Sequence, residues 1–175
     1  NNNSVRYKLE DGKDKSVVIE TNYVDYGYLD TYGITLLSGR TFDKSNSTDQ
    51  NSCLVNESAV KDFGIADLET TRFHSTLDPK KYLHIIGIVK NFHFKSLHNQ
   101  ISPYLFRLNT NEYPGGYLSV KLSAFDYPQT IWAIEATWKQ FTGNKSFDYY
   151  FVDDDFERMY TADKQNARIA VIFSI

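Results

Sequence analysis

The chain has 175 residues and a mass of 20.2 kDa, which fits one domain or two small lobes and excludes a long multidomain enzyme. Its 41% hydrophobic and 15% aromatic residues suffice for a buried core, which excludes a disordered or collagen-like chain. The 19 Lys and Arg against 22 Asp and Glu give a net charge of -3 with no basic block, which disfavours nucleic-acid binding.

The first part of the chain predicts a β-hairpin followed by a short helix. Residues 16–24 are rich in β-branched and aromatic side chains and predict a strand. We expect this strand to pair with residues 5–9 across the polar turn at 11–14. Aromatic and apolar residues at helical spacing then predict a helix over 25–32, which Gly33 ends.

A strand-to-helix step follows a polar stretch. Residues 34–37 predict a brief extended piece, and residues 43–52 have no apolar periodicity and predict a surface loop. The apolar residues 53–55 predict a short strand. Asn56 is a good N-cap residue, so a helix is expected over 57–63.

The most apolar strand of the chain is expected over residues 82–89. Its apolar run is nearly continuous, which is typical of a central strand covered on both faces. Residues 104–108 and 117–122 predict two further strands, and the Pro-Gly-Gly turn between them favours a hairpin.

The last part of the chain predicts a helix, a strand and a second helix. Residues 127–141 carry apolar side chains at spacings of three and four, and Gly143 follows them. A strand is expected over 147–152, and a final helix after the acidic cluster 153–155. Because the order strand, helix, strand occurs twice, we predict an α+β fold with a mixed sheet in two βαβ-like lobes.

No pattern in the sequence predicts catalysis, a metal or a cofactor. Asp153, Asp154 and Asp155 have the oxygen ligands that divalent cations prefer, but Glu157 three residues after Asp154 favours a helix-capping role. No histidine pair has the spacing of a zinc-protease helix, and the glycine patterns of esterase elbows and phosphate loops are absent. Cys53 begins an apolar strand, where a buried thiol is expected.

Two features leave alternatives open. The 13 tyrosines suit either a stacking platform for sugars or partners, or a core with hydroxyl groups at its rim. The apolar run 169–175 suits either a buried C-terminal helix or the start of a transmembrane helix, because seven residues are far fewer than the roughly 20 that span a bilayer.

Three segments, read in order, carry a family resemblance. They are residues 23–42, residues 53–59, and residues 85–98 followed by 101–103. The pattern resembles the extracytoplasmic core domain of MacB/FtsX-type ABC transporter permeases. The motif positions are Gly39, Arg40, Asn56, Glu57, Gly87, Asn91, Phe92, His93 and Pro103. We expect these positions to be structural rather than catalytic.

The chain departs from the family pattern at two places. Asn91 stands where the family usually has an aspartate, which argues against a charge-dependent role there. The first strand and helix that usually precede the segment at Tyr23 are shortened or missing, so we expect an incomplete first lobe.

The resemblance implies that residues 1–166 form a periplasmic core domain and that residues 167–175 begin a truncated transmembrane helix. The implied protein sits in the inner membrane of a bacterium and is no enzyme. Its implied partners are its own transmembrane helices, a separate cytoplasmic ATPase subunit, a second permease and a protein of the cell envelope, with no nucleic acid.

Two rival hypotheses belong to other functional classes. The first is a free ligand-binding or carbohydrate-binding module that uses the tyrosine-rich surface, which predicts a concave aromatic pocket. The second is a hydrolase that uses His93 or His98, which requires a carboxylate within hydrogen-bond reach of the histidine.

Overall fold

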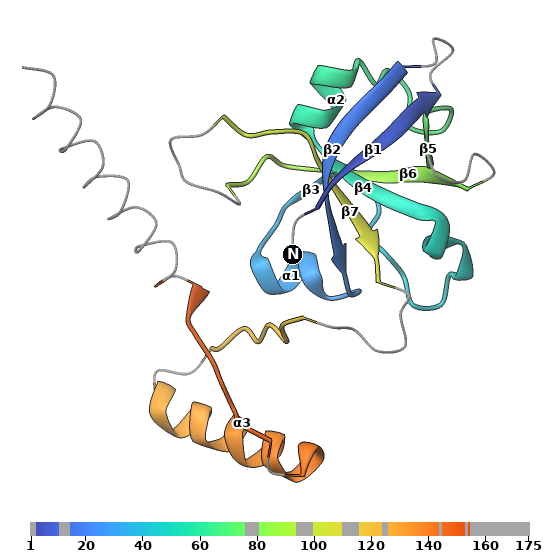
Figure 1. The fold of residues 1–175 in the computed structure, drawn as a ribbon. Helices are drawn as coiled ribbons and strands as arrows, with labels where there is room; N and C mark the ends of the chain where they lie inside the picture. Colours follow the sequence, from blue (N-terminus) through green and yellow to red (C-terminus); the bar gives the residue numbers. More distant parts are fainter. Residues whose placement is uncertain are drawn as a thin grey trace, which may run out of the picture. The chain divides into compact units, whose positions relative to one another are not determined.

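The computed structural model describes residues 3–10, 15–75, 81–93, 100–109, 116–123, 126–143, 145–152 and 154 (Figure 1). These residues belong to two compact units: unit 1 comprises residues 1–92 and 100–119, and unit 2 comprises residues 93–99 and 120–175. Within the described ranges, no helix is both long and apolar enough to cross a membrane. The predicted final helix, the apolar run 169–175 and His98 lie outside the described residues.

Unit 1 consists mainly of strands, as its described residues show. Its elements are β1 (Asn3–Glu10), β2 (Lys15–Val24), α1 (Tyr28–Tyr32), β3 (Leu36–Gly39), the 3-10 helix η1 (Ser47–Asn51), β4 (Ser52–Asn56), α2 (Glu57–Phe63), β5 (Arg72–Ser75), β6 (Tyr82–Val89) and β7 (Tyr104–Leu108).

The seven strands of the described residues form one mixed sheet that closes on itself. Their order is β3-β6-β4-β7-β2-β1-β5, and β5 pairs back onto β6. Six strands therefore make a closed ring, and β3 pairs with the end of β6 (Figure 1). The pairs β2–β7 and β4–β6 are parallel, and the others are antiparallel. The predicted α+β class with a mixed sheet is confirmed.

One hydrophobic cluster of unit 1 combines alternate strand residues with a residue of α2. Alternate residues of the strands point inward, as the period of two in a strand requires, and the helix adds Ala59. The predicted hairpin of β1 and β2 is confirmed, with Val5 opposite Ile19. The buried residues of this cluster are Tyr7, Leu9, Val17, Ile19, Cys53, Val55, Ala59, Ile65, Phe73, Leu83, Ile85 and Leu105.

Both predicted helices of unit 1 form, and glycines end them. Gly33 and Gly64 adopt left-handed conformations, with φ of 65° and 70°, and their N–H groups donate to carbonyls of the last turn. The helix expected over 25–32 begins only at Tyr28, because its first residues form a turn in which the Tyr28 N–H donates to the Asp25 carbonyl.

The structure corrects three strand predictions. The hairpin expected between 104–108 and 117–122 is wrong, because β7 pairs with β2 and β4, and residues 116–123 form no strand. Strand β6 is interior, but it alternates between buried and half-buried residues rather than being covered equally on both faces. Strand β5 was not expected, because its four residues Arg72–Ser75 include two polar side chains and a histidine.

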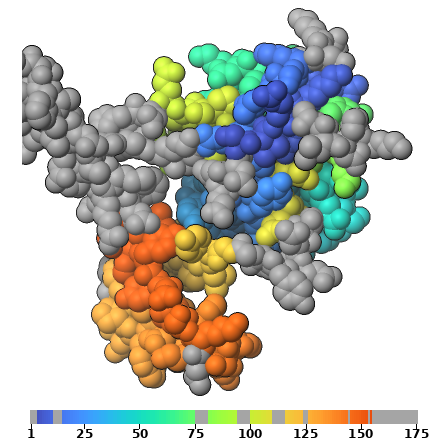
Figure 2. Space-filling view, viewed as in Figure 1, coloured from blue at the N-terminus to red at the C-terminus, as the bar shows by residue number. Residues whose placement is uncertain are grey.

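The described residues of unit 2 include one helix and the segment that follows it. Helix α3 (Tyr127–Thr142) begins at Asp126, whose side chain accepts from the Gln129 N–H, and ends at Gly143. The predicted helix is confirmed. The strand expected over 147–152 is wrong, since no described residue gives this segment a ladder partner. Figure 2 shows the segment (dark orange) lying against α3 (light orange).

Candidate functional site

Asn56 joins the start of α2 to the start of β7. Its side chain is fully buried, and its Oδ1 accepts from the N–H groups of Ala59 and Tyr104 at 3.0 and 2.9 Å. Its Nδ2 donates to the Ser102 carbonyl at 2.9 Å. The predicted N-cap therefore also satisfies two backbone groups at the beginning of a strand 46 to 48 residues further along the chain.

Two hydrogen bonds link Asn91 to Glu57 and Ser58, the first residues of α2. The Asn91 N–H donates to Glu57 Oε2 at 2.8 Å, and the Ser58 N–H donates to Asn91 Oδ1 at 3.0 Å. The acceptor at position 91 needs no charge, because an amide oxygen accepts from the backbone as an aspartate would. This pair ties the first turn of α2 to the chain leaving β6.

Phe92 forms an aromatic cluster with two residues of β7. Its ring lies 5.3 Å from the ring of Tyr104 and 5.5 Å from that of Phe106, measured between centroids. Tyr28 of α1 reaches the same ring of Phe106 at 5.6 Å. The Pro103 carbonyl accepts from the Glu20 N–H at 3.4 Å and so helps to align β7 with β2. Aromatic contacts of this kind add to the area they bury.

Gly39 and Gly87 allow two backbones to approach closely. They are opposite each other in the β3–β6 pair. Gly39 has a φ of +77°, and a Cβ there would lie 2.2 Å from the Ile86 oxygen. A Cβ on Gly87 would lie 2.6 Å from the Arg40 oxygen and 3.0 Å from a Leu54 methyl group. Only glycine fits this contact without movement of the backbone.

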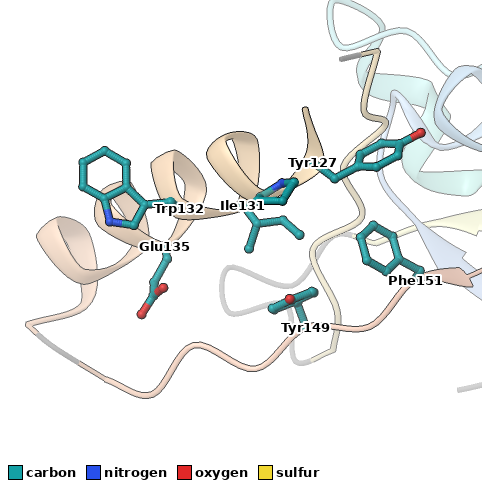
Figure 3. A pocket seen from close by; sticks show the side chains of 7 residues that line it. Tyr127, Ile131, Trp132, Glu135, Tyr149 and Phe151 are labelled. Atoms are coloured by element: carbon teal, nitrogen blue, oxygen red, sulfur yellow. The ribbon is translucent and has the colours of Figure 1, made fainter. Parts of the chain in front are cut away.

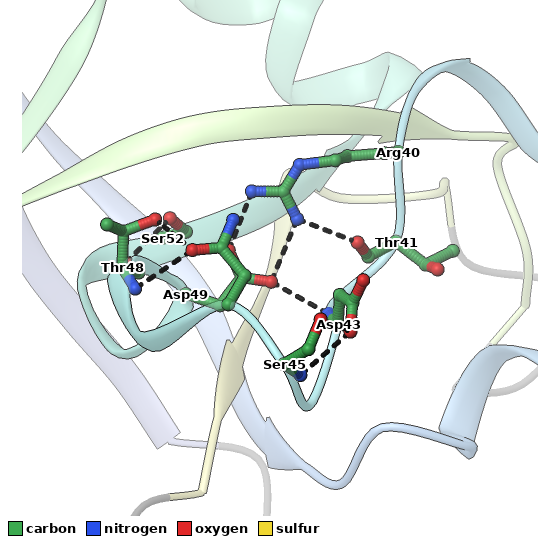
Figure 4. A network of polar contacts seen from close by, with 8 residues as sticks. Arg40, Thr41, Asp43, Ser45, Thr48, Asp49 and Ser52 are labelled. Atoms are coloured by element: carbon green, nitrogen blue, oxygen red, sulfur yellow. Dashed lines mark hydrogen bonds and ion pairs between the residues drawn. The ribbon is translucent and has the colours of Figure 1, made fainter.

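Arg40 forms a bidentate ion pair with Asp49 (Figure 4). The two guanidinium nitrogens lie 2.8 and 2.6 Å from the two carboxylate oxygens, and the Asp43 N–H donates to the same carboxylate at 2.8 Å. The Asp49 side chain is fully buried, whereas that of Arg40 is 43% exposed. Hydrogen bonding from Arg40 lowers the pKa of Asp49 below its ordinary value.

The motif positions thus fall into two groups. Asn56, Glu57, Asn91, Phe92 and Pro103 meet at the junction of α2, β6 and β7, which we call the α2 joint. Gly39, Arg40 and Gly87 meet where β3 pairs with the end of β6, which we call the β3–β6 crossing. His93 is exposed, and no carboxylate of the described residues bonds to it.

Sequence reasoning missed Asp49, which holds the segment after β3 in place. It lies in the stretch predicted as a polar surface loop, where a buried carboxylate was not expected. Asn46, which caps η1 by accepting from the Thr48 N–H at 3.1 Å, was the available signal for a helical turn there.

Among the described residues of unit 1, one histidine contacts a carboxylate: His74 Nε2 lies 2.5 Å from Glu10 Oε2. No three His, Cys, Asp or Glu side chains of those residues lie close enough to share a metal ion. Burial raises the pKa of the Cys53 thiol far above its usual range, and the side chain is inaccessible to solvent. Burial also lowers the pKa of His84, with a smaller contribution from the charge of Arg72.

Unit 2 contains an open aromatic groove along α3 (Figure 3). Its volume is about 460 Å³, and the residues that line it are Tyr127, Pro128, Ile131, Trp132, Glu135, Tyr149 and Phe151. Phe151 packs edge-on against both Tyr127 and Tyr149, with ring centroids 5.9 Å apart in each case. The Trp138 indole N–H donates to the Ser146 carbonyl at 3.0 Å and fixes the segment to the helix.

Comparisons with solved structures identify the fold. The chain is similar to the periplasmic region of MacB from Actinobacillus actinomycetemcomitans, with a TM-score of 0.60, 18% identity, and coverage of 91% of this chain and 73% of that one. It is also similar to a domain of a putative permease protein from Porphyromonas gingivalis, with a TM-score of 0.56 and 18% identity. That match covers 78% of this chain and 59% of the other, which is less than two thirds of its length.

No protein-family model matches the sequence, and no curated protein matches it significantly. The likeness to the two solved structures confirms the predicted MacB-like fold.

Proposed function

We propose that this chain is an extracytoplasmic domain of a bacterial ABC transporter permease. The observation that carries the proposal is the fold, which matches the periplasmic region of MacB over 91% of the chain. The order of the motif positions along the chain supports it, because the α2 joint and the β3–β6 crossing are built from those residues.

The domain's proposed role is mechanical rather than catalytic. It couples ATP-driven motion of the membrane subunit to export or to partner proteins in the envelope. A domain that transmits motion must move as a rigid body. The closed sheet of unit 1 suits this task, as do the buried side-chain bonds of the α2 joint, which tie segments distant in sequence.

The proposal includes the parts of the assembly that lie outside this domain. Residues 1–166 form the core domain, and residues 167–175 begin a transmembrane helix. A separate cytoplasmic ATPase subunit hydrolyses the nucleotide, the permease is dimeric, and the domain faces the periplasm from the inner membrane, where it meets an envelope protein.

The parent reading frame tests this proposal. We expect the apolar run that begins at Ile169 to continue for about a dozen residues, to the length that spans a bilayer, with further spans beyond it. Co-purification of the parent protein with an ATPase subunit, and ATP hydrolysis by that complex, would add support. A frame that ends just after Ile175 and has no span before Asn1 would refute the proposal and favour a free binding module.

A further inference from the structure

The groove of unit 2 leaves large aromatic surfaces in contact with solvent. Trp132 is 72% exposed and Tyr149 is 55% exposed, although both belong to the wall of one groove. No residue of α3 is fully buried. Aromatic side chains gathered in a concave site are typical of ligand binding, whereas isolated exposed apolar residues need no explanation.

The segment opposite α3 holds its rings in a row. Phe147, Tyr149 and Phe151 are two residues apart, and adjacent ring centroids are 5.6 and 5.9 Å from each other. Phe147 and Tyr149 are stacked, with 30° between their ring planes, whereas Tyr149 and Phe151 meet edge-on, with 87° between theirs. Tyr149 and Phe151 of this row line the groove and make its lower wall aromatic, and Ile131 and Glu135 point toward that wall from α3 (Figure 3).

The charges of the groove favour an uncharged ligand. Among the described residues that line the groove, Glu135 is the one with a charged side chain, and Lys139 Nζ lies 2.6 Å from Glu135 Oε1. The pair leaves the site close to neutral, so it offers little net attraction to a free cation or anion. The polar groups of the lining are the Glu135 carboxylate, the Tyr127 and Tyr149 hydroxyls and the Trp132 indole N–H, which suit hydroxyl groups of a ligand.

We infer that this groove binds a neutral carbohydrate chain. A pyranose ring has one apolar face of C–H groups, which stacks on an aromatic ring, and a rim of hydroxyls, which donate to carboxylates and phenols. Trp132 and Tyr149 provide the stacking surfaces, and Glu135 accepts hydroxyl hydrogen bonds. The groove's volume of about 460 Å³ lies within the range of about 300–1,000 Å³ that is usual for small-ligand sites. This site is independent of the proposed function, because a permease domain and a free module can each contain it.

Titration of the 175-residue chain with neutral trisaccharides tests the inference. The probes are chitotriose and maltotriose, and binding is followed by calorimetry and by saturation transfer from the protein to the sugar protons. We expect saturable binding of at least one trisaccharide. Trp132→Ala and Tyr149→Ala should each weaken it by about tenfold or more, because each removes a stacking surface. Both side chains are largely exposed, so neither variant should unfold the protein, which circular dichroism checks.

The matched control is Phe141→Ala. Phe141 is an aromatic residue of the same helix that is 83% exposed and does not line the groove, so its removal should leave sugar binding unchanged. Absence of saturable binding to both trisaccharides would overturn the inference. Equal weakening by Phe141→Ala and Trp132→Ala would also overturn it, because the effect would then come from general apolar adhesion. Concentration-dependent dimerisation that Trp132→Ala abolishes, without sugar binding, would assign the face to a second copy of the chain.

Discussion

Replacing Asn56 by alanine tests whether the α2 joint stabilises unit 1. The variant loses an N-cap, which costs about 1 kcal/mol. It also leaves the Tyr104 N–H and the Ser102 carbonyl without their partner, at about 1 kcal/mol or more each. We therefore expect a loss of about 3 kcal/mol, which lowers the Tm by about 6–12 °C in a chain of this length.

The assay must report on unit 1. Both tryptophans, Trp132 and Trp138, lie in α3 of unit 2, so thermal unfolding is followed by far-ultraviolet circular dichroism rather than by tryptophan fluorescence. The control is Asn46→Ala, which removes an N-cap at a more exposed site where water replaces the lost bond, and it should cost about 1 kcal/mol or less. If Asn56→Ala costs no more than Asn46→Ala, the long-range bonds of Asn56 contribute nothing measurable and the reasoning is wrong.

The two remaining predictions concern the β3–β6 crossing and the buried carboxylate beside it. Gly39→Ala should lower the free energy of unfolding by about 2 kcal/mol or more, because its Cβ would clash with the Ile86 oxygen. The control Gly33→Ala is also at positive φ but in open space, so it should lower the free energy of unfolding by only about 1 kcal/mol. Equal losses of the two variants in urea unfolding would contradict the clash. Asp49→Asn should lower the Tm at pH 7. Because the folded pKa of Asp49 is depressed, its stabilisation is present above the unfolded pKa of about 3.9 and is lost as the pH falls through the folded pKa. The difference in Tm between the wild type and Asp49→Asn should therefore shrink below about pH 4, and a difference that stays constant down to pH 2 would refute this cause.

The sequence predicted best those elements that local chemistry defines. Helix α2 was predicted from its N-cap Asn56, and helix α3 from its apolar spacing and Gly143, because these signals depend on residues close in sequence. The hairpin of β1 and β2 was likewise found from a polar turn between two apolar runs. The motif positions were found through the family resemblance, but their mutual contacts were not.

The pairings that close the sheet depend on residues distant in sequence, and the pattern of one strand does not specify its neighbour. Tyr104–Leu108 was expected to pair with the next apolar segment, yet it pairs with β2 more than 80 residues earlier and with β4. The buried Asp49 was missed for a different reason: its partner Arg40 is only nine residues away, but the polar stretch around Asp49 is typical of a surface loop. The groove of unit 2 could not be predicted, because it depends on how the segment 147–151 packs against α3.

The side of the membrane on which unit 1 lies is the most direct test of the central claim. Glu69→Cys introduces an exposed thiol in the parent protein, whereas the natural Cys53 is fully buried and should remain silent in the folded domain. Intact spheroplasts are treated with a membrane-impermeant maleimide. The proposed location predicts that the Glu69→Cys protein gains label before lysis relative to the wild type treated in the same way. Labelling of Glu69→Cys only after lysis would place the domain inside the cell and contradict the account.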